Sequence, residues 1–143
     1  MDKVLSYLGI ARKAGYLLTG EENCGSAVRT GKARLLLLAQ DASANAVSRA
    51  EGFLQGKKAP LLRLPLDKEE LSRLLGRPGC SMVVLTDAGL ASSLARALAE
   101  ATGAPEHQEA ARALAARWER LRSRRRPAGG KGKSMTGKRR KTV

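Results

Sequence analysis

The chain has 143 residues, of which 43% are hydrophobic, enough for one domain with an ordinary core and an appendage. Its net charge of +14 at pH 7 favours a polyanionic partner, either nucleic acid or an anionic membrane surface. Two cysteines outside any CxxC pair and a single histidine exclude a zinc site, and no run approaches the roughly 20 apolar residues of a membrane span.

Apolar residues at helical spacing alternate with short apolar runs along the first hundred residues. In chain order we predict helix 3–14, strand 16–18, helix 21–31, strand 34–40, helix 43–55, strand 60–65, helix 66–75, strand 81–87 and helix 89–101. The run RLLLLAQ at 34–40 is typical of an interior parallel strand that is buried on both faces. The alternation predicts a three-layer α/β/α sandwich with a four-stranded mixed sheet, formed by residues 1–103.

The composition changes after residue 103. Residues 104–143 carry a net charge of +10, against +4 for residues 1–103. Apolar residues spaced by four, four and three predict a basic amphipathic helix over 104–126: Ala110, Leu114, Trp118 and Leu121. Residues 127–143 cannot bury enough apolar surface to fold, so we expect a flexible, disordered basic tail. His107 is expected to be a surface residue.

Catalytic patterns are poorly represented. Residues 1–103 contain no histidine, so no Ser-His-Asp or Cys-His arrangement can form there. The adjacent carboxylates Glu21 and Glu22 begin a predicted helix, where acidic side chains complement the helix dipole. The nearest approach to a phosphate loop, Gly132 to Lys138, is followed by Arg139 in place of the Ser or Thr that would hold magnesium. We predict no enzymatic activity and no cofactor.

A polar helix face follows Gly20. Glu22, Asn23 and Ser26 fall on one side of the predicted helix, and a glycine at its start lets a phosphate approach the exposed N–H groups. Asn and Glu side chains can bond to base edges. Three basic residues further along could neutralise backbone phosphates: Arg29, Lys32 and Arg34. From spacing alone, a nucleic-acid surface and an ordinary solvated helix face both remain open.

Two segments carry a family resemblance: LGIARKAGYLLTGEENCGSAVRTGKARLLLLAQDAS and LSRLLGRPGCSMVVLTDAGLA. Together they resemble the kink-turn RNA-binding ribosomal protein superfamily, and within it the bacterial YlxQ-type ribosomal-protein-like branch. The likeness covers about residues 2–100, with the order of elements preserved. It implies an α/β fold and, as partner, a kink-turn or similarly bent structured RNA.

The resemblance also implies particular contact residues. The family's RNA motif runs from a glycine at a helix start, through Asn-Glu, to a lysine one turn later. Gly20 matches the glycine, while Glu22 and Asn23 carry the two side-chain types in the opposite order. Ser26 stands at the place of the lysine. We hypothesise that Arg29, three residues further on, reaches the same phosphate.

A loop before the last strand covers the flipped-out base of the kink in the family, and GRPGCS at 76–81 takes its place here. The complete predicted RNA surface is Gly20, Glu21, Glu22, Asn23, Ser26, Arg29, Lys32, Arg34, Arg77, Cys80 and Ser81. Further residues are predicted to contact phosphates without sequence preference, through counterion release: Arg124, Arg125, Arg126, Lys131, Lys133, Lys138, Arg139, Arg140 and Lys141.

The sequence as a whole predicts a monomeric, cytoplasmic RNA-binding protein associated with the ribosome or translation, with ribosomal RNA as a candidate partner and no membrane attachment. The alternative is a protein-interaction module of the translation machinery. Its partner site would be the C-terminal helix, through Leu114, Trp118 and Leu121, and its non-specific RNA affinity would come from the basic tail.

Overall fold

The computed structural model describes residues 1–125. Within them the elements are α1 (Asp2–Ala14), β1 (Leu17–Thr19), α2 (Glu21–Arg29), β2 (Leu35–Leu38), α3 (Ala44–Leu54), β3 (Leu61–Arg63), α4 (Lys68–Leu75), β4 (Met82–Leu85), α5 (Ala88–Thr102) and α6 (Pro105–Arg125). The order of helices and strands is the one that the sequence predicts. None of the helices in these 125 residues is long and apolar enough to cross a membrane.

The four strands form one mixed sheet in the order β1-β4-β2-β3. The strand β2 is interior, as its apolar run predicts: Leu36 lies opposite Val84 of β4 and Leu61 of β3. Its pairing is parallel with β3 and antiparallel with β4, so the expected parallel neighbour lies on one side only. The strand β4 also pairs antiparallel with β1.

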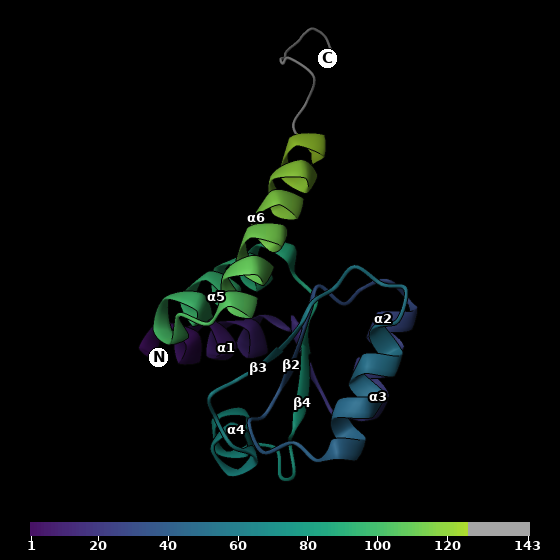
Figure 1. The fold of residues 1–143 in the computed structure, drawn as a ribbon, viewed down its shortest axis with the longest axis vertical. Coiled ribbons are helices and arrows are strands. Elements are labelled where there is room, and N and C mark those ends of the chain that lie inside the picture. The colour runs from purple at the N-terminus through teal and green to yellow at the C-terminus, as the bar shows by residue number, and fades with distance from the viewer. Residues whose placement is uncertain (126–143) are drawn as a thin grey trace, which may run out of the picture.

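Both faces of the sheet are buried, because alternate residues of β2 and β4 point to opposite sides. Leu36, Leu38, Met82 and Val84 pack with residues of α2 and α3. Leu35, Leu37, Val83 and Leu85 pack with residues of α1, α4 and α5. Figure 1 shows α2 and α3 on one side of the sheet and α1 and α5 on the other. The predicted three-layer sandwich is therefore confirmed.

The helix α6 packs along α5 and adds Ala110 and Leu114 to the core. Trp118 lies against the start of α5: its Cζ2 atom is 3.3 Å from the position that a Cβ on Gly89 would take. The expectation that His107 lies on the surface is wrong. Its side chain is buried in the turn from α5 to α6, where Nδ1 lies 2.6 Å from Oγ1 of Thr102.

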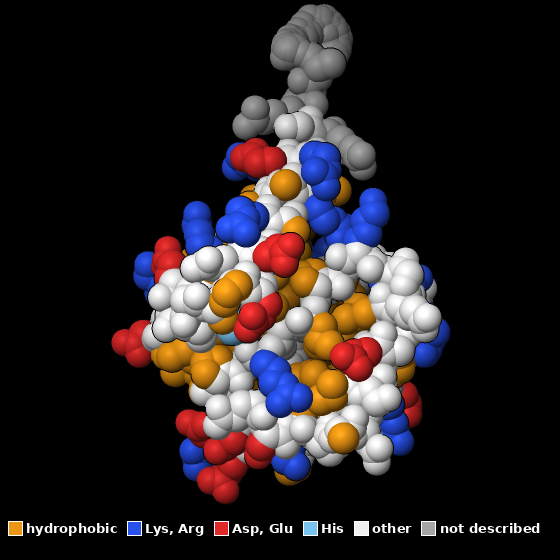
Figure 2. All heavy atoms as spheres, in the orientation of Figure 1, with side chains coloured by type: hydrophobic (Ala, Val, Ile, Leu, Met, Phe, Trp, Pro, Cys, Tyr) orange, Lys and Arg blue, Asp and Glu red, His pale blue; other side chains and the backbone are white. Residues whose placement is uncertain are grey.

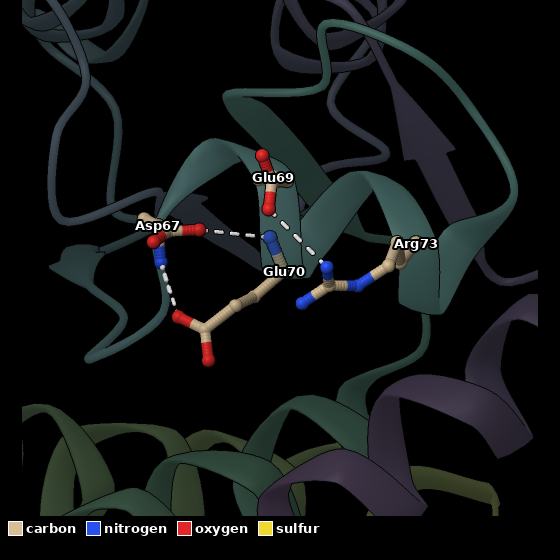
Figure 3. A network of polar contacts seen from close by, with 4 residues as sticks. All are labelled: Asp67, Glu69, Glu70 and Arg73. Carbon is tan, nitrogen blue, oxygen red and sulfur yellow. Dashed lines mark hydrogen bonds and ion pairs between the residues drawn. The ribbon is translucent and has the colours of Figure 1, made fainter.

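The helix α4 is fixed at both ends. At its start, the Asp67 carboxylate accepts from the Glu70 N–H, and the Glu70 carboxylate accepts from the Asp67 N–H (Figure 3). At its end, Gly76 adopts a left-handed conformation with φ 67°. In the loop that follows, the Cys80 N–H donates to the Ser72 hydroxyl at 2.9 Å. These contacts anchor the 76–81 loop to α4.

Candidate nucleic-acid interface

Gly20 caps the start of helix α2, and its φ of 90° and ψ of 151° lie in a region that residues with a Cβ rarely adopt. The Gly20 N–H donates to the Met82 carbonyl at 3.1 Å, and the Gly20 carbonyl accepts from the Cys24 N–H at 3.0 Å. Thus β4 and the first turn of α2 hold the glycine from both sides. A Cβ built on Gly20 meets no atom within 4 Å, so the backbone conformation rather than crowding requires glycine here.

A groove of about 260 Å³ lies beside this helix start, and we refer to it as the Gly20 groove. Its walls come from the end of α1, from β1, from the first turn of α2 and from the end of α4. The polar side chains that line it are Arg12, Thr19, Asn23 and Arg77. The charged side chains of the wall are both arginines, so the groove favours an anionic ligand.

Asn23 is oriented within this groove. Its Nδ2 donates to the carbonyl of Thr19, the last residue of β1, at 3.0 Å. A side-chain amide has a second N–H and a carbonyl oxygen, so Asn23 keeps further capacity to donate and accept. A held amide of this kind is suited to the edge of a nucleic-acid base.

Arg12 is a groove residue that the sequence analysis missed. It lies in the last turn of α1, and its Nη2 is 3.2 Å from the position that a Cβ on Gly76 would take. The sequence signal for this residue is the basic pair Arg12 and Lys13, which stands just before the turn at Gly15. That signal becomes informative only once the end of α1 is known to lie beside the end of α4.

Three residues that the sequence predicts as RNA contacts, Glu21, Glu22 and Arg29, lie on another side of α2 from the groove. Glu21, Glu22 and Arg29 line a shallow hollow of about 290 Å³ together with Phe53 of α3. Glu21 forms an ion pair with Arg49 of α3, which occupies a carboxylate that a catalytic role would need.

Arg29 folds back toward the start of α2, because its Nη1 lies 3.3 Å from the position of a Cβ on Gly25. This places the guanidinium one turn closer to Gly20 than its own Cα, on the side of Glu22 rather than of Asn23. Ser26, at the place of the motif lysine, is exposed. The hypothesis that Arg29 substitutes for that lysine therefore stays open.

Cys80 is an unsuitable contact residue because only 4% of it is exposed. Burial raises the pKa of the Cys80 thiol, which keeps the side chain neutral. Ser81 is half-buried, and its carbonyl accepts from the Ala39 N–H at 2.9 Å. In the 76–81 loop we therefore assign the predicted contact to Arg77 alone.

The inner side of α2 is apolar. Cys24 is fully buried against the sheet, and burial, with smaller contributions from Cys80 and Glu21, raises the pKa of its thiol to about 12. Within residues 1–125, no three His, Cys, Asp or Glu side chains gather where they could hold a metal ion.

Lys32 and Arg34 do not join the Gly20 groove. They follow the far end of α2, which has nine residues and is therefore about 14 Å long. The Arg34 N–H donates to the Leu85 carbonyl at 2.7 Å, at the opposite end of β4 from the 76–81 loop. The predicted tail contacts from Arg124 to Lys141 lie outside the part of the chain whose side chains the structure describes.

The fold and the groove define a small α/β domain that presents a helix start and a neighbouring loop beside an electropositive groove. A sequence model of the ribosomal protein L7Ae/L30e/S12e/Gadd45 family matches residues 2–95, and the chain belongs to that family. The superfamily that the sequence predicts is thereby confirmed, and the YlxQ-type branch is confirmed by the two relatives described next.

Two relatives and one solved structure illustrate the likeness. The chain is 30% identical over 87 residues to the RNA-binding protein YlxQ of Bacillus subtilis (strain 168), covering 61% of this chain and 86% of the relative. It is 30% identical over 77 residues to the RNA-binding protein YlxQ of Enterococcus faecium, covering 54% and 74%. A protein of unknown function from Bacillus halodurans C superposes with a TM-score of 0.62 at 30% identity, covering 67% of this chain and 96% of that one.

Proposed function

We propose that this protein is a non-enzymatic, cytoplasmic RNA-binding protein that recognises a kink-turn or similarly bent RNA through the Gly20 groove. The observation that carries the proposal is the placement of Asn23, Arg12 and Arg77 around one helix start. Two relatives carry the name RNA-binding protein, which supports an RNA partner. Family membership supports a place in the ribosome or in translation.

The geometry suggests how a bent RNA would be selected. A groove of about 260 Å³ can admit one base that has left its helix, whereas a regular duplex keeps its bases stacked and exposes mainly phosphates and sugars. Asn23 would bond to the edge of that base. Arg12, Arg77 and the first N–H groups of α2 would take the flanking phosphates.

The alternative function, a protein-interaction site on α6, is disfavoured because two of its three predicted side chains pack against the domain itself. Leu114 is 4% exposed and belongs to the core, and Trp118 packs beside Gly89. A partner would have to displace both from these contacts.

The test compares Asn23→Ala and Arg77→Gln with the double variant Lys3→Gln/Arg96→Gln, whose exposed side chains lie along α1 and α5 outside the groove. Affinity of the full chain is measured for a kink-turn RNA and for a plain duplex of equal length. Asn23→Ala removes one base contact, so we expect it to weaken kink-turn binding by about 5- to 150-fold, which corresponds to roughly 1–3 kcal/mol.

Arg77→Gln is expected to weaken binding less and to flatten its salt dependence. The double variant keeps the preference for the kink-turn. Unchanged kink-turn affinity in both groove variants, with their melting temperatures intact, would refute the proposal.

A further inference from the structure

A second basic cavity, separate from the Gly20 groove, lies at the far end of α2. Its volume is about 220 Å³, several times the roughly 30 Å³ that one water molecule takes up in the liquid. Four basic residues line it: Arg34, Lys57, Lys58 and Arg117. No acidic residue is among the residues that form its wall. We refer to it as the Arg34 cavity.

The cavity brings together three segments that are distant in the sequence. Arg34 lies between α2 and β2, the two lysines lie between α3 and β3, and Arg117 comes from α6. Figure 1 shows α6 leaving the domain at the end of the sheet opposite to α4, and Figure 2 shows Lys and Arg side chains around this part of α6. The docking of α6 through Leu114 and Trp118 therefore completes the cavity.

The charge at this position is unbalanced. The helices α2 and α3 both end here, and each helix end contributes about half a negative elementary charge. Against roughly one negative charge in total stand four side-chain cations. The cavity therefore has a net positive charge, which an anion would balance.

One polar atom of a residue that lines the cavity lacks a hydrogen-bond partner. Nε of Arg34 is buried and has no hydrogen-bond acceptor among the described residues. Buried polar groups are nearly always paired, so the Arg34 side chain is under-satisfied in this arrangement. The Arg34 backbone is itself fixed by its bond to Leu85.

The walls are preorganised by tight turns. Gly31 and Gly56 have positive φ values of 75° and 76°, and the N–H groups of Gly31 and Lys57 donate to the ends of α2 and α3 at 3.1 and 2.8 Å. Cations held on short, bonded turns lose less freedom when they bind an anion than cations on a flexible loop.

We propose that the Arg34 cavity is a second RNA contact that holds phosphodiester groups of the same RNA beyond its bend. This inference rests on the proposed function, because it takes the anion to be RNA. The α2 helix separates the two sites by about 14 Å, so the phosphates held here are not those beside Gly20. With four cations and no hydrogen-bonding amide side chain in its wall, the cavity adds affinity without reading sequence.

The experiment uses the full chain with Lys57→Gln/Lys58→Gln, both exposed residues, and the control Lys3→Gln/Arg96→Gln, which removes the same charge elsewhere. Affinity is measured between roughly 50 and 200 mM salt for a kink-turn RNA with a long or a short flanking stem. With the long stem, losing two phosphate contacts is expected to reduce the slope of log affinity against log salt by about 1.4–1.8. The short stem and the control variant are expected to show a much smaller change.

The outcomes separate this inference from the proposed function. Equal slopes for the cavity variant and the control would overturn the second contact, whatever the kink-turn preference. A slope reduction in a protein that prefers no kinked RNA would retain the second contact and refute the proposed function. Binding of inorganic phosphate or ATP that Lys57→Gln/Lys58→Gln abolishes, with unchanged RNA affinity, would assign the cavity to a small phosphate ligand and overturn the RNA contact.

Discussion

The two ends of α2 carry different chemistry. Beside Gly20 an oriented amide, two arginines and a helix start surround one groove, with a carboxylate-bearing hollow on another side of the helix. At the far end, the charged side chains of the Arg34 cavity are cations alone. Hydrogen-bonding groups of mixed kind can distinguish one RNA shape from another, whereas cations bind any phosphate backbone. The comparison predicts discrimination at one end and added affinity at the other.

The difference between the two ends of α2 depends most on the docking of α6, because Arg117 of the Arg34 cavity lies on that helix. Leu114→Ala removes a side chain that is 4% exposed, so we expect the free energy of unfolding to fall by about 2–5 kcal/mol. Leu121→Ala, at a half-buried position on the same helix, is the control and should cost less. Chemical denaturation measures both; equal small losses would show that α6 is not part of the folded unit.

The next largest effect is expected from a substitution of Gly20 itself, which would disturb the start of α2. Gly20→Ala forces a Cβ into a backbone conformation that costs about 1–3 kcal/mol, and we expect a matching loss of stability and weaker kink-turn binding. Gly9→Ala within α1, where a Cβ meets nothing within 4 Å, should instead gain about 0.5–1 kcal/mol. A Gly20→Ala protein with wild-type stability and affinity would contradict the assigned role of the helix start.

The buried thiol of Cys24, which lies between the two ends of α2, predicts that the free energy of unfolding depends on pH. Burial raises the pKa of Cys24 to about 12, so the folded state retains a proton that the unfolded chain loses near the ordinary thiol pKa of 9.0. The stabilisation is therefore complete below pH 9 and is lost as the pH rises toward the folded pKa, at about 1.4 kcal/mol per pH unit. Urea titrations from pH 8 to 10.5 of wild type and Cys24→Ala should diverge in slope, and parallel curves would argue against the buried neutral thiol.

The smallest effect is expected from Arg12, the groove residue that only the structure reveals. Arg12→Gln should lower the salt-dependence slope of RNA binding by about 0.7–0.9, the value of one phosphate contact. Lys13→Gln, the neighbouring exposed residue that does not line the groove, removes the same charge and should change little. Equal changes in the two variants would mean that Arg12 acts only through net charge.

Much of the fold could be predicted from local pattern. Alternating apolar runs identified every helix and strand, and the four leucines of β2 indicated its interior position. The antiparallel pairing of β2 with β4 could not be predicted, because strand direction depends on how the connecting segments cross the sheet. His107 was placed wrongly for a similar reason: the α5–α6 turn buries it through the tertiary packing of α6.

The site was only partly predictable. Helical spacing indicates the polar face that follows Gly20, and the family resemblance adds the loop containing Arg77. The structure places Asn23 and Arg77 in one groove. Arg12 was missed because its proximity to Gly76 is a tertiary contact. Arg34 was grouped with Gly20 because both flank the same short helix, yet the length of that helix separates them.

Recognition of a bent RNA by the Gly20 groove is the proposal on which the other expectations depend. The most direct measurement is the affinity of the full chain for a kink-turn RNA and for a plain duplex of equal length, each at a low and a high salt concentration. We expect a preference for the kink-turn RNA that persists at high salt, because hydrogen bonds to an unstacked base are screened less than phosphate contacts. Equal affinities that fall together as salt rises would contradict it.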